Sequence, residues 1–406
     1  MNRVISARLA PVLGLFFTTA VAAQGSVTSN AFNPAISLIL DGRFASFENE
    51  AEGYELPGFM LGGEAGLGAE GFSVGHSELV FSANIDDQYY GQFTVAIADH
   101  GGETEVELEE AFIQTLGLGA GFTVKAGRFF SGIGYLNEQH MHAWDFADAP
   151  LVYRGLFGDQ LRDDGVQVRW LAPTDVFLEL GAEALRGERF PSAGAANDGK
   201  GGFAAFAKLG GDLGESHSWR LGLSHWRADV VDREAGGHNH GGAAEEHASF
   251  SGDSAVSGVD FVWKWAPDGN ATERSFKFQA EYFLRDEEGD VTVVAHGATD
   301  EGRYDGTQTG WYAQAVYQFM PRWRVGLRYD ALDADNDVDD AHAAEHAGLD
   351  AEGHTPERWS AMVDFANSEY SRLRLQFNRD ESSADADNQV LLQYTMSLGA
   401  HGAHPF

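Results

Sequence analysis

The feature that most constrains the fold of this chain is an alternation of apolar and polar residues that recurs along most of its 406 residues. Near the carboxyl end, Leu373, Leu375 and Phe377 alternate with arginine, glutamine and asparagine. Successive side chains of a β-strand point to opposite faces, so each such segment is a predicted strand with one apolar and one polar face. The sixteen predicted strands cover residues 35–47, 73–84, 89–98, 105–116, 121–130, 163–171, 175–185, 202–210, 217–229, 254–265, 274–285, 308–319, 322–332, 356–366, 370–379 and 388–398.

The connections between these segments alternate in length. Short ones such as 85–88 and 117–120 follow every second strand, and long ones such as 130–162, 230–253 and 333–355 follow the others. A soluble β-sandwich would show the same alternation within a strand, but it would not explain the alternating loop lengths. An even number of strands with short turns at one end and long loops at the other is typical of outer-membrane barrels. We therefore expect an all-β fold, a transmembrane antiparallel β-barrel of about 16 strands with short periplasmic turns and long extracellular loops.

The amino terminus predicts export. Arg3 and Arg8 precede an apolar stretch over residues 9–21, and the small residues Ala22 and Ala23 suit cleavage. This stretch is shorter than the roughly 20 residues that a spanning helix needs, which disfavours a membrane anchor. We expect residues 1–23 to be a signal peptide and residues 24–406 to form the barrel in a Gram-negative outer membrane. The chain ends on Phe406, and we expect the barrel assembly machinery to recognise this terminal aromatic residue.

Charge and cysteine content exclude several classes of function. The chain carries 27 basic and 62 acidic residues, for a formal net charge of −35. Phosphate binding needs a basic face, so no nucleic-acid partner is expected. The absence of cysteine rules out disulfides, thiolate metal sites and cysteine nucleophiles. The barrel's predicted partner is outer-membrane lipid, which tryptophans near the strand ends would contact.

The third long loop, residues 130–162, occupies the position at which porins fold a loop into the lumen. Residues two apart in an extended segment share a face, so His140 and His142 could hold a divalent cation beside Asp145. The alternative is that these histidines only make hydrogen bonds. The predicted constriction consists of His140, His142, Asp145, Asp148 and Arg154.

The two later long loops, 230–253 and 333–355, are rich in histidine and acidic residues. Tracts of this composition are typical of metal-collecting segments, although an acidic loop with incidental histidines has the same composition. No resident cofactor is expected, and Zn²⁺ enters only as a transported or loop-bound ion. The predicted metal ligands are His238, His240, His247, His342, Glu345, His346 and His354.

Two motifs resemble those of hydrolases but lack the context of an active site. Residues 342–346 match H-x-x-E-H, which in metalloproteases needs a buried helix and a third ligand. Residues 71–75 match G-x-S-x-G, which in α/β-hydrolases needs a turn from strand to helix. Because one lies in an acidic loop and the other opens a predicted strand, we do not expect an enzyme.

Arginines recur on the polar faces of three successive predicted strands. If acidic residues of the third loop faced them, a transverse field would cross the constriction and set charge selectivity. If instead the arginines paired with acidic residues of neighbouring strands, they would have no effect on permeation. The predicted basic ladder of the lumen consists of Arg322, Arg324, Arg328, Arg358, Arg372 and Arg374.

Several segments are similar to a known family. Residues 71–86 (GFSVGHSELVFSANID), 123–129 (TVKAGRF), 137–146 (NEQHMHAWDF), 164–168 (DGVQV) and 398–406 (LGAHGAHPF) carry the similarity. They resemble the phosphate-selective porin O/P-like superfamily, and more closely its His-rich, zinc-responsive outer-membrane branch, whose members are often labelled TonB-dependent receptors. The resemblance implies a sixteen-stranded barrel for passive or facilitated transport, usually as a homotrimer.

Two departures from related proteins narrow the expected function. A phosphate filter needs stacked lysines and arginines, whereas lysine is scarce here and the loops are acidic. A 22-stranded TonB-dependent receptor with its plug would need a much longer chain. We therefore expect a porin or channel for small solutes that aids uptake of divalent metal, zinc above all. The alternative is a general or anion-selective, phosphate-type porin with incidental loop histidines.

Overall fold

A computed structural model describes residues 34–51, 54–62, 65–100, 103–192, 201–235, 247–295 and 298–399. The predicted signal peptide, His238, His240 and Phe406 lie outside these residues. None of the described helices is long and apolar enough to cross a membrane. The described elements are β1 (Ala35–Ser46), β2 (Gly71–Val74), β3 (Ser77–Asn84), β4 (Tyr89–His100), β5 (Glu103–Thr115), β6 (Phe122–Phe130), η1 (Met141–Ala143), α1 (Leu151–Phe157), β7 (Arg162–Leu171), β8 (Phe177–Leu185), β9 (Gly202–Leu213), β10 (His217–Glu234), β11 (His247–Trp265), η2 (Pro267–Gly269), β12 (Ser275–Ala295), β13 (Ala298–Met320), β14 (Trp323–Val338), α2 (Ala341–His346), β15 (Glu357–Ser368), β16 (Ser371–Glu381) and β17 (Asp387–Gly399).

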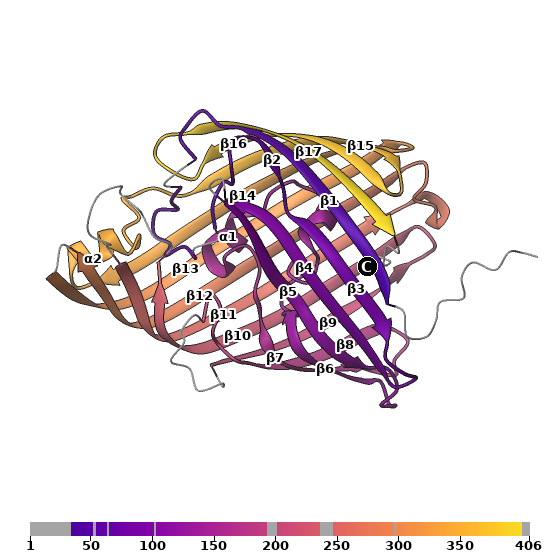
Figure 1. The fold of residues 1–406 in the computed structure, drawn as a ribbon, viewed down its shortest axis with the longest axis horizontal. Helices are drawn as coiled ribbons and strands as arrows, with labels where there is room; N and C mark the ends of the chain where they lie inside the picture. Colours follow the sequence, from indigo (N-terminus) through magenta and orange to yellow (C-terminus); the bar gives the residue numbers. More distant parts are fainter. Residues whose placement is uncertain are drawn as a thin grey trace, which may run out of the picture.

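The strands form one closed antiparallel barrel (Figure 1). Each strand pairs with its neighbour in sequence, and β1 closes the ring by pairing with β17 from Ser37 opposite Gly399 to Ser46 opposite Val390. β2 and β3 both pair with β1, so they are two parts of a single barrel strand interrupted at Gly75 and His76. Counted in this way the barrel has 16 strands, which confirms the predicted fold class.

The two faces of the wall have opposite polarity. On β16, Leu373, Leu375 and Phe377 are 44–47% exposed on the outer surface. The intervening Arg374, Gln376 and Asn378 are completely buried inside the barrel. A soluble protein would bury the apolar face, whereas a membrane barrel turns it toward lipid and its polar face toward the lumen.

At the end with the long connections, several strands run farther than the sequence predicted. β10 and β11 include residues 230–234 and 247–253, and β14 extends through Val338, so the bounds 230–253 and 333–355 for outer loops were too wide. The apolar alternation continues there within the acidic composition: Val291 and Val293 of β12 and Tyr304 of β13 are fully buried. These strand extensions form a rim above the apolar part of the wall.

Candidate functional site

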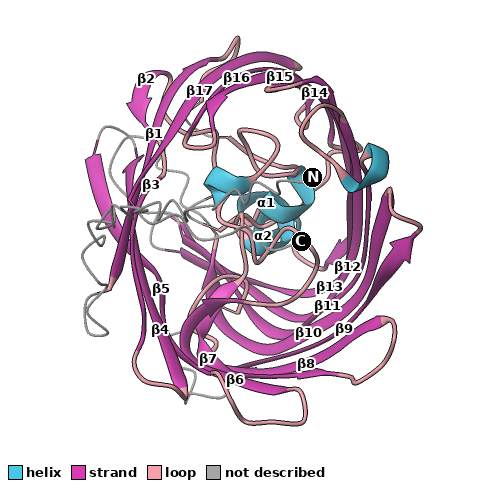
Figure 2. Ribbon diagram, turned by 90° about the vertical axis from the view of Figure 1, so that its right-hand side faces the viewer, coloured by secondary structure: helices cyan, strands magenta, loops and turns pink. Residues whose placement is uncertain are grey.

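The segment between β6 and β7, residues 131–161, folds into the barrel and is here called the lumen loop. Figure 2 shows its helix α1 inside the ring of strands. Every residue of α1 is buried. Tyr153 of α1 contacts the rings of Phe283 and Tyr312, and its hydroxyl donates a 3.0 Å hydrogen bond to Glu281. The lumen loop is therefore packed firmly against the wall formed by β12 and β13.

Arginines of β14 to β16 bind the lumen loop. Arg324 and Arg328 contact the carboxylates of Asp145 and Asp148 at 2.9 and 2.7 Å. Arg358 and Arg374 donate to the backbone oxygens of Ala149 and Trp144 at 2.6 and 2.8 Å, and Arg372 donates to that of His142 at 2.7 Å. Because a buried charge is stable only when it is paired and hydrogen-bonded, these contacts fix the loop to the wall.

Arg322 does not belong to this group, which corrects the predicted ladder. It lies exposed in the tight turn between β13 and β14, with a φ of 72°. Arg154 of the predicted constriction lies on α1, where its guanidinium is 3.7 Å from Asp159 and packs over the Tyr54 ring. The arginines that do reach the lumen meet carboxylates of both kinds. Arg328 contacts Asp148 of the lumen loop and Asp330 of its own strand, so the loop carboxylates of the first alternative and the strand pairing of the second occur together.

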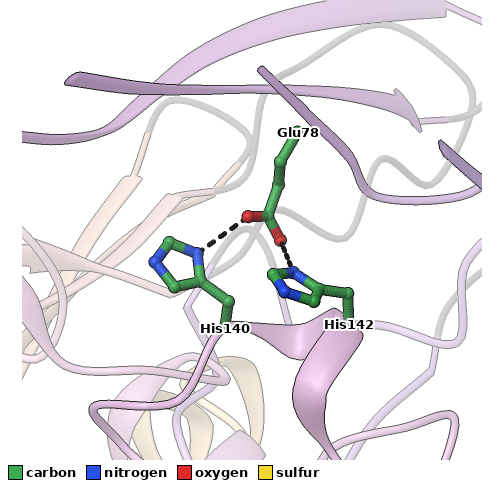
Figure 3. A group of neighbouring side chains, drawn as sticks. All are labelled: Glu78, His140 and His142. Carbon is green, nitrogen blue, oxygen red and sulfur yellow. Dashed lines mark hydrogen bonds and ion pairs between the residues drawn. The ribbon is translucent and has the colours of Figure 1, made fainter. Parts of the chain in front are cut away.

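Residues 140–142 of the lumen loop meet three glutamates of the wall, and Figure 3 shows one of them, Glu78, between His140 and His142. His142 Nδ1 lies 2.7 Å from Glu78 Oε1, and His140 Nδ1 lies 3.0 Å from Glu78 Oε2. His140 Nε2 is 3.0 Å from Glu110 Oε2, and its Nδ1 is 3.4 Å from Glu109 Oε2. We call this group, together with His76, the His–Glu cluster.

Two irregularities in the wall position the glutamates. The ladder between β4 and β5 skips Glu109, because Thr94 pairs with Glu110 and Val95 with Leu108. Because of this β-bulge, the side chains of Glu109 and Glu110 both point into the barrel. In a regular strand, one of two successive side chains would point outward. The second irregularity is the break between β2 and β3 at Gly75, where a Cβ would approach Asp41 Oδ2 to 2.4 Å. The next residue, His76, points its Nε2 at Glu109 Oε1 over 2.7 Å.

Sequence reasoning identified the two histidines but not their partners. Asp145, the expected third ligand, instead binds Lys277 and Arg324. Glu109 and Glu110 are two adjacent acidic residues within a predicted strand of alternating polarity. This break in the alternation was the sequence feature that could have indicated a β-bulge. Glu78 gave no signal beyond its place on a polar strand face.

The charges around His140 favour its protonated form. This residue lies on the lumen loop, outside the membrane-spanning strands. Burial by itself lowers the pKa of His140, but the charge of Glu78 and contacts with Glu109 and Glu110 outweigh it. The pKa of His140 is therefore raised well above its ordinary value.

The His–Glu cluster lies between two cavities. One has a volume of about 750 Å³, and Glu78, Glu110, His140 and His142 form part of its lining. The other, of about 220 Å³, lies on the side of β1, β2 and β17, and His76 and Met141 line it. Residues of one cluster thus line both cavities.

The predicted outer ligands are only partly brought together. His342 and His346 lie on α2 with their Nε2 atoms 3.0 Å apart, and His342 Nδ1 is 3.1 Å from Asp300 of β13. Glu345 is exposed on the same short helix. His354 instead contacts the backbone oxygen of Glu381 on β16, and His247 begins β11.

Comparison with known proteins gives one relative in sequence and several in structure. No family model matches the chain. It is 31% identical over 412 residues to an uncharacterized protein of Aquifex aeolicus (strain VF5), covering 93% of this chain and 81% of that protein.

The solved structures with the same fold are outer-membrane proteins. The trimer form of OmpT from Vibrio cholerae has a TM-score of 0.53 at 10% identity, over 90% of this chain and 99% of that one. The channel DcaP of Acinetobacter baumannii has a TM-score of 0.53 at 14% identity, covering 90% and 96%. The anion-selective porin of Comamonas acidovorans has a TM-score of 0.51 at 11% identity, covering 90% and 99%. At these identities the likeness shows the fold, a barrel of the Gram-negative outer-membrane type.

Proposed function

The chain belongs to the same protein family as the uncharacterized Aquifex aeolicus protein, and we propose that it is a porin-type outer-membrane channel for small solutes. A 16-stranded barrel is wide enough to enclose an aqueous lumen. The lumen loop narrows this space and leaves a cavity of about 750 Å³ on one side of the His–Glu cluster. Diffusion past a narrowed lumen needs no catalytic group, so the proposal includes no enzymatic activity.

We further propose that the channel favours divalent cations and aids zinc uptake. The observation that carries this step is the rim, where the imidazoles of His342 and His346 lie beside the carboxylate of Asp300. Imidazole and carboxylate together are suited to Zn²⁺. The strand extensions around this group are acidic, and negative charge at a channel mouth raises the local cation concentration. The resemblance to the zinc-responsive branch of the phosphate-selective porin O/P-like superfamily supports the same assignment.

One observation favours the second candidate, a general or anion-selective porin. Lys125, Arg169, Lys208 and Arg220 line the 750 Å³ cavity on the side of β6 to β10. Glu78 and Glu110 line the same cavity on the side of β3 to β5, and Glu138 and Glu179 line it beside the basic residues, where they pair with Arg169. Charged side chains that line a pore set its selectivity without any metal. In this case the histidines at the rim would be incidental.

The remaining assignments are proposals of the same kind. The outer surface, with apolar residues such as Leu373 and Phe377 exposed, suits contact with outer-membrane lipid. Residues 1–23 would direct export, and Phe406 would be recognised during barrel assembly. A homotrimer is proposed because a trimer form occurs for a protein of the same fold.

Reversal potentials in planar bilayers separate the two candidates. In a KCl gradient at low salt we expect cation preference that shrinks at 1 M, where the Debye length is about 3 Å. With a ZnCl₂ gradient, the variant carrying His342→Ala, His346→Ala and Asp300→Asn should pass less zinc current than wild type. His225→Ala is the matched control, because His225 is an exposed histidine that contacts Ser257 on the wall. Anion preference at low salt would instead establish the second candidate, and an absence of conductance would refute the channel.

A further inference from the structure

The His–Glu cluster differs in chemistry from the other contacts of the lumen loop. Glu78 and Glu109 are almost completely buried, at 0% and 1% exposure. The acidic residues of the loop form ion pairs with arginine or lysine. Glu78, which belongs to the wall, instead contacts two imidazoles of the loop. A buried carboxylate requires a compensating charge, and neutral imidazole supplies none. Glu109 also has Arg162 at 3.7 Å from its Oε1, whereas among the described residues Glu78 forms ion pairs with the two imidazoles alone. The charge of Glu78 therefore calls for protons on these histidines or for a cation.

Three atoms of the cluster converge without hydrogen bonds. Within the described part of the chain, Glu78 Oε2, Glu109 Oε2 and His140 Nδ1 are buried and have no hydrogen-bond partner of normal geometry. His140 Nδ1 lies 3.0 Å from the first oxygen and 3.4 Å from the second. These three atoms can each offer a lone pair, and they face one another. A metal ion placed between them would accept all three lone pairs.

The spacing of the ligand atoms fits a small transition-metal ion. Glu78, His140 and His142 each offer a ligand atom, and these atoms lie within 4.8 Å of one another. His76, Glu78 and Glu109 form a second such set that shares Glu78. Zinc bonds of about 2.0–2.2 Å in a tetrahedral site keep the ligand atoms roughly 3.4 Å apart. A mixed nitrogen and oxygen set favours zinc over magnesium or calcium, which take oxygen ligands.

We propose that Glu78, His140 and His142 bind one divalent transition-metal ion, and that this ion joins the lumen loop to the wall at β3. His140 and His142 come from the loop and Glu78 from β3, so the metal adds a link between loop and wall to the imidazole contacts and to the hydrogen bond from Arg372 to the backbone oxygen of His142. The metal site itself is independent of the proposed transport. Its effect on permeation rests on the proposed channel function, because the cluster lies between the two cavities.

Metal binding would control only one part of the loop. The arginines bind Trp144, Asp145, Asp148 and Ala149, and they keep their charge at any physiological pH. Loss of the metal would therefore free the side chains of His140 and His142 while the rest of the loop stays in place. A bound ion would occupy space at the border of the 750 Å³ cavity, and its removal would leave that space to solute.

Calorimetry with ZnCl₂ on the purified, detergent-solubilised barrel tests the site. A background carrying His238→Ala, His240→Ala, His247→Ala, His342→Ala, His346→Ala and His354→Ala removes the predicted outer histidine ligands, so that the remaining binding reports on the lumen. We expect about one Zn²⁺ per chain in this background. Glu78→Gln, which keeps the shape of the side chain, and His140→Ala should each weaken the affinity at least tenfold, since even outer partners of metal ligands are worth 10–100-fold.

Two further measurements distinguish loss of the metal site from a failure of the variant to fold. Heat-modifiable migration reports whether each variant forms the barrel, and X-ray absorption of the zinc-loaded background protein reports imidazole ligands through their outer-shell scattering. Equal zinc affinity with and without Glu78→Gln, or an absorption spectrum without imidazole scattering, would overturn the proposal in favour of protonated histidines. Zinc binding in a protein that conducts nothing would leave the metal site standing and refute the channel.

Discussion

Two adjacent parts of the lumen loop, residues 140–142 and 144–149, are held to the same barrel by different chemistry. Arginines of β14 to β16 hold residues 144–149, which we call the arginine-held part, through buried ion pairs and hydrogen bonds to backbone oxygens. The imidazoles of His140 and His142, which directly precede this part, contact glutamates of β3 and β5, and Arg372 reaches only the backbone oxygen of His142. Guanidinium groups keep their charge, whereas imidazoles change charge near neutral pH and bind metals. The loop therefore has one permanent attachment and one that responds to protons and metal ions.

The largest effect is expected when the permanent attachment is broken. Arg358 is fully buried and contacts Asp148, Asp330 and the backbone oxygen of Ala149. Arg358→Ala would leave two buried carboxylates without this partner, and we expect a loss of about 3–5 kcal/mol in the free energy of unfolding. Urea-induced unfolding in detergent measures the change.

The matched control for that experiment is Arg379→Ala. Arg379 is an exposed residue of the same wall and lies 3.1 Å from the exposed Glu381. Exposed ion pairs contribute roughly 0–1 kcal/mol, so this variant should unfold almost as wild type does. Similar losses in the two variants would show that the arginine-held part has no special role.

An intermediate effect is expected from pH at residues 140–142. The pKa of His140 is raised, so in metal-free protein its charged contacts contribute fully below about pH 6.5 and are lost as pH rises through the raised value. Amide hydrogen exchange in EDTA, corrected for the intrinsic rate, should show decreasing protection at residues 139–142 as pH rises. Each unit by which the pKa is raised corresponds to a tenfold change.

Zinc provides the comparison for the pH experiment. A metal ion replaces the protons, so with saturating Zn²⁺ the protection at residues 139–142 should stay high as pH rises. Residues 145–149 should show constant protection in both conditions, because arginine does not titrate there. Parallel loss in both parts of the loop would contradict the distinction between them.

The smallest effect on stability is expected at the rim. His342 and His346 are not buried, and the double variant His342→Ala and His346→Ala removes little packing. Surface substitutions of this kind change stability by less than about 0.5 kcal/mol. The same urea experiment should therefore find it indistinguishable from wild type. A loss of several kcal/mol would show that α2 supports the barrel.

The candidate site was only partly predictable from the sequence. His140 and His142 stand out as residues two apart on a long loop, and the arginines stand out on polar strand faces. Their partners depend on where the lumen loop crosses the barrel, which no local pattern encodes. Asp145 is near His142 in sequence, yet it lies against Lys277 and Arg324. Glu78 is 64 residues from His142, yet it is its direct partner.

The sequence by itself determined the barrel, because the period of two is a property of the extended backbone and needs no knowledge of the neighbouring strands. It located all sixteen barrel strands, although the acidic composition hid the outer parts of β12, β13 and β14. Only the tertiary structure decided which charges meet inside the lumen. A buried charge is stable only beside a compensating group, and in this barrel those groups come from strands and a loop far apart in the chain.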